Sequence, residues 1–126
     1  APRAGELILI VEDNEKNRRL VRDVLQFKGY QTIESETGEE GVELARTRRP
    51  ALVLMDIQLP GIDGITALKQ IRDDPATHSM RVMAVTASAM TQDRQTILAA
   101  GFDGYQSKPI NVKSFLEAVQ ELLAKP

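Results

Sequence analysis

Short apolar runs alternate with amphipathic segments along the whole chain. The runs at 7–11, 51–55 and 82–85 contain apolar residues without polar alternation. Such runs are typical of strands buried on both faces, which belong to parallel sheets. Two weaker strands are predicted at 31–35 and 104–107, where β-favouring residues lie between turn signals.

The five intervals that follow these strands have apolar residues at helical spacing. Four of the predicted helices follow a residue that can cap them, namely Asn14, Thr37, Asp63 and Asn111. The helix expected at 90–100 is poorly apolar, with Ile97 and Leu98 as its main anchors. Strict alternation of strand and helix predicts an α/β fold with helices on both faces of a parallel sheet.

Composition narrows the function classes. The chain has 126 residues, a net charge of −2 and no cysteine, so disulfides and thiolate chemistry are excluded. The charge balance gives no basic footprint for nucleic acid, and no apolar run is long enough for a bilayer. We therefore expect one domain over 1–126, with its core at about 6–124, that is cytoplasmic and binds neither nucleic acid nor membrane.

Polar residues stand at the carboxyl ends of four predicted strands. They are Glu12 and Asp13, then Asp56, Thr86 and Lys108. Each alone has an ordinary explanation, such as helix capping for Asp13 or strand propensity for Thr86. In a parallel sheet, however, these ends share one edge, where open α/β sheets bind ligands. The pattern therefore predicts three carboxylates and one ammonium group in one site.

Three carboxylates near one lysine repel one another and raise their own pKa values unless a cation neutralises them. Mg²⁺ is the cation that such oxygen ligands favour, and it leaves positions open for water and phosphate. One carboxylate can then act as a nucleophile toward phosphorus and form an acyl phosphate.

Other phosphate-binding classes fit less well. The first strand is followed by an acidic segment, 12–17, instead of a Gly-x-Gly-x-x-Gly turn, and the chain contains no P-loop. Aspartyl phosphatases of the haloacid-dehalogenase type use Asp-x-Asp, whereas Gln58 occupies the second acidic position here.

Four segments together resemble the receiver domain of two-component response regulators. They are Ile8-Leu-Ile-Val-Glu-Asp-Asn14, Leu54-Met-Asp-Ile-Gln-Leu-Pro-Gly-Ile-Asp-Gly64, Ala84-Val-Thr-Ala87 and Ser107-Lys-Pro-Ile110. The resemblance covers nearly the whole chain. It implies a (βα)5 flavodoxin-like three-layer sandwich, whose five-stranded parallel sheet has the order 2-1-3-4-5 with helices on both faces.

The resemblance also assigns the metal site. It implies that Asp56 accepts phosphate from a phosphohistidine on a sensor histidine kinase or histidine phosphotransferase. Asp13 and Asp56 would ligate Mg²⁺ together with the backbone carbonyl of Gln58. Glu12 would act on the metal through water, and Lys108 would pair with the phosphoryl group.

Further along the chain, the resemblance makes Thr86 and Tyr105 the switch pair and implies a cis bond before Pro109. A downstream protein effector would bind the face formed by the fourth helix, fifth strand and fifth helix. We expect a monomer or a weak, phosphorylation-linked dimer that is a signalling switch and not an enzyme. A receiver-like interaction module without phosphate turnover stays open as an alternative, and an aspartyl-phosphate phosphatase as a weaker one.

Overall fold

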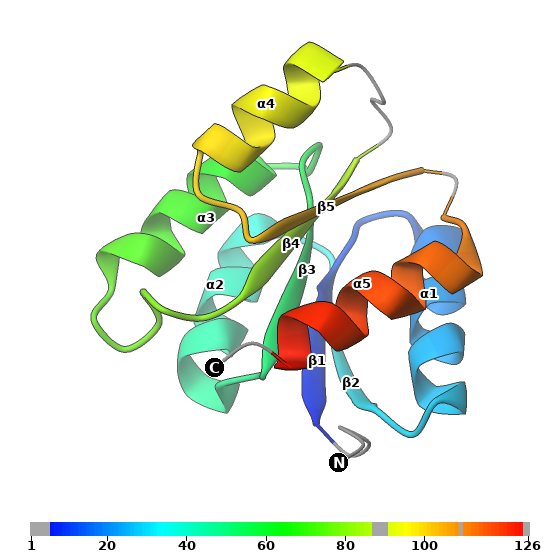
Figure 1. The fold of residues 1–126 in the computed structure, drawn as a ribbon. Helices are drawn as coiled ribbons and strands as arrows, with labels where there is room; N and C mark the ends of the chain where they lie inside the picture. The colour runs from blue at the N-terminus through cyan, green and yellow to red at the C-terminus, as the bar shows by residue number, and fades with distance from the viewer. Residues whose placement is uncertain (1–5, 87–90, 109, 125–126) are drawn as a thin grey trace.

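The fold is a five-stranded parallel sheet between two layers of helices (Figure 1). The structure, a computed structural model, describes residues 6–86, 91–108 and 110–124, with backbone alone at 91–94. The predicted cis bond before Pro109 lies outside these residues. The elements in chain order are β1 (Leu7–Val11), α1 (Glu15–Phe27), β2 (Gln31–Ser35), α2 (Gly38–Arg48), β3 (Leu52–Asp56), α3 (Gly64–Asp73), β4 (Val82–Thr86), α4 (Thr91–Ala99), β5 (Gly104–Ser107) and α5 (Val112–Ala124).

The sheet has the strand order β2-β1-β3-β4-β5, so the fold class predicted from the sequence is confirmed. Its register aligns the carboxyl ends of the strands at one edge. Val11 pairs with Met55 at the end of β1, and Thr86 pairs with Ser107 at the end of β4. The polar residues that follow β1 and β5 are therefore brought to the same edge as Asp56.

Alternate residues of the strands fill two separate cores. Ile10 and Leu54 face α1 and α5, whose Leu25 and Phe115 are completely buried, and the opposite face packs against α2, α3 and α4 (Figure 1). Because there is a core on each face of the sheet, every residue of β3 and β4 is buried. This burial explains why those strands have no polar alternation in the sequence.

Local capping agrees with the predicted helix starts. Side chains of Asn14, Asp63 and Asn111 each accept a hydrogen bond from the backbone N–H three residues on. The Thr37 side chain caps α2 in the same way by accepting the N–H of Glu40. The N–H of Thr37 itself donates to Ser35 Oγ at 3.3 Å. In a capping box the Glu40 side chain would accept this N–H, whereas here Ser35 accepts it.

Some apolar residues of the helices are exposed, among them Leu98, which the sequence suggested as an anchor. Leu20, Leu98 and Val112 are each at least two-fifths accessible to solvent, whereas Phe115 is the main anchor of α5. Ile97, the other anchor suggested for the helix at 90–100, is buried. Within the described residues, no helix combines the length and apolarity that crossing a bilayer requires.

Candidate functional site

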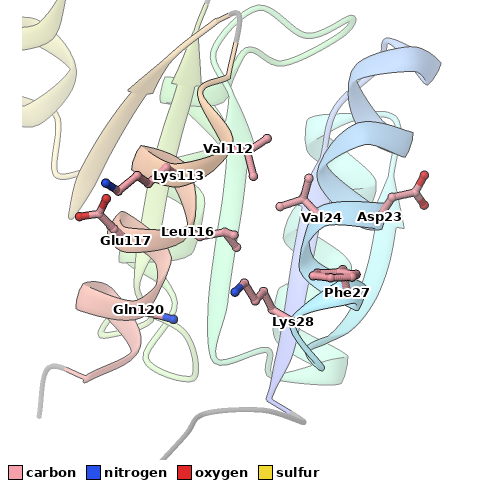
Figure 2. A pocket seen from close by; sticks show the side chains of 9 residues that line it. All are labelled: Asp23, Val24, Phe27, Lys28, Val112, Lys113, Leu116, Glu117 and Gln120. Carbon is pink, nitrogen blue, oxygen red and sulfur yellow. The ribbon is translucent and has the colours of Figure 1, made fainter.

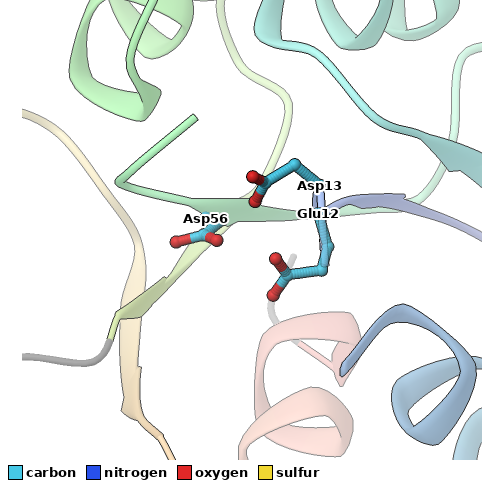
Figure 3. A group of neighbouring side chains, drawn as sticks. All are labelled: Glu12, Asp13 and Asp56. Atoms are coloured by element: carbon cyan, nitrogen blue, oxygen red, sulfur yellow. The ribbon is translucent and has the colours of Figure 1, made fainter. Parts of the chain in front are cut away.

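Three carboxylates meet at the carboxyl edge of the sheet. Oxygen atoms of Glu12, Asp13 and Asp56 all lie within 4.8 Å of one another. Figure 3 shows the three side chains converging from the end of β1 and the end of β3. Glu12 and Asp56 are only 4% and 5% exposed, whereas Asp13 is open to solvent. The site therefore has two buried carboxylates and one that solvent can reach.

The backbone holds Glu12 firmly in this position. Its N–H donates to the Ser35 carbonyl at 3.0 Å, which extends the pairing of β1 with β2 by one residue. One of its carboxylate oxygens accepts the N–H of Asn14 at 3.1 Å. Because Asn14 also caps α1, the turn that starts this helix fixes the Glu12 side chain as well.

Lys108 joins two of the carboxylates. Its Nζ lies 2.6 Å from Glu12 Oε1 and 3.0 Å from Asp56 Oδ2. The backbone N–H of Lys108 donates to the Thr86 carbonyl at 2.7 Å, so the end of β4 places this lysine. Sequence reasoning expected Lys108 in the site, and the structure shows which two carboxylates it contacts.

Burial and repulsion change the proton affinities of this group. Burial raises the pKa of Glu12, the nearby Asp56 carboxylate raises it further, and the bonds from Lys108 and Asn14 offset only part of the change. Burial alone would lower the pKa of Lys108, but its contacts with Glu12 and Asp56 outweigh this and raise it. Lys108 is therefore a permanent cation at neutral pH, and one cation faces three carboxylates.

The loop after β3 places Gln58 beside Asp56. The Gln58 N–H donates to Asp56 Oδ1 at 3.2 Å, so both oxygens of Asp56 have protein partners. The Gly64 N–H donates to the Ile57 carbonyl at 2.8 Å and closes the loop. This closure holds Gln58 at the rim of the site.

An open hollow of about 820 Å³ lies over the carboxylates. Residues in and next to the β1–α1 and β3–α3 loops line it, together with Lys108. The full lining is Glu12, Asp13, Asn14, Asn17, Asp56, Ile57, Gln58, Leu59, Pro60, Asp63 and Lys108. Sequence reasoning did not assign Asn17 or Asp63 to the site. Their positions in the sequence could have indicated this, because Asn17 lies in the first turn of α1, Asp63 caps α3, and both helices start at this edge of the sheet.

Thr86 and Tyr105 are not among the residues that line the hollow. Ala84 pairs with Tyr105, and Thr86 is two residues beyond Ala84, so Thr86 and Tyr105 share the α3–α4 face of the sheet. Thr86 is buried, whereas Tyr105 is half-buried against the core on that face. The predicted switch pair thus forms a diagonal pair on neighbouring strands.

A second hollow, of about 780 Å³, lies between α1 and α5 and shares no residue with the first. In Figure 2, Val24 and Leu116 point into the space between the two helices, and Asp23 points away from it. The groove has a mostly apolar lining, which includes the exposed Phe27. Since it has no group of converging carboxylates, we place the chemistry at the sheet edge.

The donor set at the sheet edge fits a hard divalent cation. Carboxylate oxygens from Glu12, Asp13 and Asp56 are the ligands that Mg²⁺ prefers, and Lys108 neutralises part of their charge. Asp13 gives the site an accessible oxygen, and the hollow leaves room for a further ligand. A metal ion here would neutralise the charge of Asp56, which adds to the effect of burial in raising the pKa of Glu12.

Comparison with known proteins shows one family over nearly all of the chain. The model of the response regulator receiver domain matches residues 8–120. The polar-differentiation response regulator DivK of Brucella anthropi is 45% identical over 116 residues, which cover 92% of this chain and 94% of that protein. DivK of Brucella ovis is 44% identical with the same coverage. These relatives agree with the similarity of the chain's motifs to those of DivK, a single-domain regulator.

Solved structures give the same assignment. A response regulator from Chloroflexus aurantiacus has a TM-score of 0.92 and 28% identity, over 96% of this chain and 99% of that chain. The receiver domain of a sensor histidine kinase from Pseudomonas aeruginosa has a TM-score of 0.89 and 32% identity, over 97% and 100% of the two chains. That structure is described with a magnesium ion coordinated in its active-site cleft. This chain therefore belongs to the response regulator receiver domain family.

Proposed function

We propose that this receiver is a phosphorylation-dependent switch in which Asp56 accepts a phosphoryl group in the presence of Mg²⁺. Receiver domains of this family act in two-component and phosphorelay signalling, normally as switches and not as classical enzymes. One observation carries the finer assignment. Asp56 is a buried carboxylate that lies within 4.8 Å of two others and accepts a hydrogen bond from a lysine at 3.0 Å.

We assign the metal ligands as the resemblance to receiver domains implies. Protein groups bond both oxygens of Glu12 and both oxygens of Asp56, so these bonds do not separate the two roles, and the indirect role of Glu12 through water rests on the resemblance. Asp13 and Asp56 would then hold Mg²⁺ together with the Gln58 carbonyl. The bound cation would supply charge neutralisation for the incoming phosphoryl group.

Phosphoryl transfer needs a nucleophile and a cationic group that can pair with the phosphoryl oxygens as they gain negative charge. An oxygen of Asp56 forms the new O–P bond, while the N–P bond of a phosphohistidine breaks and its imidazole nitrogen leaves with the electron pair. Negative charge then moves from the carboxylate to the phosphoryl oxygens. Lys108 Nζ, already 3.0 Å from Asp56 Oδ2, is close enough to follow it.

Partners follow from the same assignment. Receiver domains interact with kinases and effectors in general. For this chain we propose a sensor histidine kinase or histidine phosphotransferase as the donor, and a protein effector that binds the α4–β5–α5 face. Thr86 and Tyr105 support this choice of face because Thr86 ends β4 and Tyr105 lies on the neighbouring strand β5. In the proposed switch, the Thr86 hydroxyl turns to the phosphoryl group and the Tyr105 ring turns inward.

The test is covalent labelling. Incubation with acetyl phosphate and Mg²⁺ should add one phosphoryl group to the wild-type chain, visible as a single mass increment in intact mass spectrometry. Asp56→Asn should abolish the increment, since an amide is a poor nucleophile and carries no charge for the metal. Asp63→Asn is the matched control, because Asp63 lines the same hollow and asparagine can still cap α3.

Two results would count against the proposal. Undiminished labelling of Asp56→Asn would show that another residue accepts the phosphoryl group. An unlabelled wild-type chain would favour the alternative, a receiver-like interaction module that does not turn over phosphate.

A further inference from the structure

Arg18 is a partly buried cation that contacts the backbone of the site. It lies in the first turn of α1, and its side chain is only 13% exposed. Its Nη1 donates to the backbone carbonyl of Glu12 at 3.0 Å. Its Nε and Nη2 lie 3.2 Å and 3.4 Å from the carboxylates of Glu34 and Glu36. All three nitrogens of the guanidinium thus have partners.

We propose that Arg18 is a positioning residue for the metal-binding segment Glu12–Asp13, an inference that rests on the proposed function. The peptide group between these two residues is planar, so the Glu12 carbonyl and the Cα of Asp13 lie in one plane. By holding that carbonyl, Arg18 fixes the plane of the peptide group and so the position of the Asp13 Cα, from which the side chain extends. The carboxylates of Glu34 and Glu36 keep the guanidinium itself in place.

This bond completes the set of contacts at Glu12. The N–H of Glu12 is held by Ser35, its carboxylate by Asn14 and Lys108, and its carbonyl by Arg18. Asp13, by contrast, is exposed and follows directly after this fixed peptide. Mg²⁺ demands near-ideal octahedral geometry, so a small rotation of the peptide would misplace the oxygen that Asp13 offers.

The charge of Arg18 and its hydrogen bond predict opposite effects, which makes the inference testable. If Arg18 acted only through its charge, its removal would leave the site more negative and Mg²⁺ would bind more tightly. If Arg18 acts by positioning, its removal weakens binding in spite of the lost positive charge. Groups that orient metal ligands typically change affinity 10–100-fold.

The experiment is an amide NMR titration with MgCl₂ that gives the Kd of Mg²⁺ for unphosphorylated protein. We expect Arg18→Gln and Arg18→Lys both to raise this Kd about tenfold. Lysine keeps the charge but lacks the planar fork that reaches the Glu12 carbonyl and the two glutamates together. Arg22→Gln is the control, since Arg22 also lies near Glu34, at 3.9 Å, and donates its Nε to Asp23.

The outcomes separate the two proposals. A wild-type Kd in Arg18→Lys, or tighter binding in Arg18→Gln, would overturn the positioning role and leave the proposed function intact. A wild-type chain that neither binds Mg²⁺ nor takes up a phosphoryl group would overturn both. If the Arg18 variants fail to fold, Glu34→Gln replaces them: it frees one side of the guanidinium, and a Kd equal to the wild-type value would overturn the role.

Discussion

Gly64 packs against the backbone of the proposed phosphoacceptor and offers a direct test of how the fold supports the site. It is the buried first residue of α3, and its N–H donates to the Ile57 carbonyl. A Cβ added here would lie 2.3 Å from the Asp56 carbonyl oxygen and 2.8 Å from Ile57 Cα. Both neighbours are backbone atoms, so neither can rotate away as a side chain would.

The size of the effect follows from these distances. An ordinary carbon–oxygen contact is about 3.3 Å, so Gly64→Ala requires a relative shift of roughly 1 Å between α3 and the end of β3. Forcing extra atoms into a packed region costs about 1–3 kcal/mol. Loss of the Gly64–Ile57 hydrogen bond adds about 1 kcal/mol. We therefore expect Gly64→Ala to lower the free energy of unfolding by about 2–4 kcal/mol.

Urea unfolding measures this loss. With a slope of about 2 kcal/mol per M, the midpoint should fall by roughly 1–2 M. Gly104→Ala is the matched control, because the nearest neighbours of its Cβ would be the Leu122 and Met83 side chains, at 3.0 Å and 3.4 Å. Those chains can adjust, and alanine is favoured over glycine in a strand by about 0.5–1 kcal/mol, so the control should stay within about 1 kcal/mol of wild type.

The site supplies a second measurement. The displaced Asp56 backbone should reduce labelling by acetyl phosphate in Gly64→Ala under conditions where the protein is still folded, whereas Gly104→Ala should be labelled like wild type. Equal urea midpoints for wild type and Gly64→Ala would refute the argument, since they would mean that α3 can move away from β3 without cost.

Two further predictions concern Lys108 and Thr86. The pKa of Lys108 is raised by its two carboxylate partners, which outweigh burial, so its stabilising contribution is complete below pH 10.5 and is lost as the pH rises through the folded-state value. Burial and a nearby carboxylate raise the pKa of Tyr30 above 10.0, so its contribution to the free energy of unfolding is also lost as the pH rises. Lys108→Met and Tyr30→Phe should each make the free energy of unfolding fall less steeply at alkaline pH. An unchanged pH profile in Lys108→Met would contradict the assignment. Thr86→Ala should keep phosphorylation but shrink the phosphorylation-dependent amide shifts in β5 and α5, whereas Thr86→Ser should retain them; identical shifts in phosphorylated Thr86→Ala and wild type would show that the hydroxyl is not the trigger.

The sequence was most informative where burial leaves a pattern. Strands such as β3 and β4 are buried on both faces, so their apolar runs and the polar residues after them could be read directly. The convergence of Asp13, Asp56 and Lys108 followed because all strand ends of a parallel sheet share one edge. The strand order itself came from the family resemblance, because alternation of strands and helices is compatible with several orders.

Other features depend on tertiary contacts that no local pattern encodes. Phe115 is the buried anchor of α5, whereas Val112, the first residue of the same helix, is exposed, and the spacing of apolar residues does not distinguish the two. Arg18 was missed for a related reason. On a helix surface it is an ordinary cation, and its contact with the Glu12 carbonyl exists only because α1 folds back beside β2.

The charge balance of the site links metal and phosphate. One lysine cannot neutralise three carboxylates, two of which are buried, so the metal-free site carries excess negative charge. Under the proposed function, phosphorylation removes the charge of Asp56 but adds about −1.5 to −2 on the phosphoryl oxygens, and the excess grows. A divalent cation must then bind the phosphorylated form more tightly than the unphosphorylated form. Linkage is reciprocal, so the same cation favours the phosphorylated state, and Arg18 affects phosphorylation through any change it makes in the metal site.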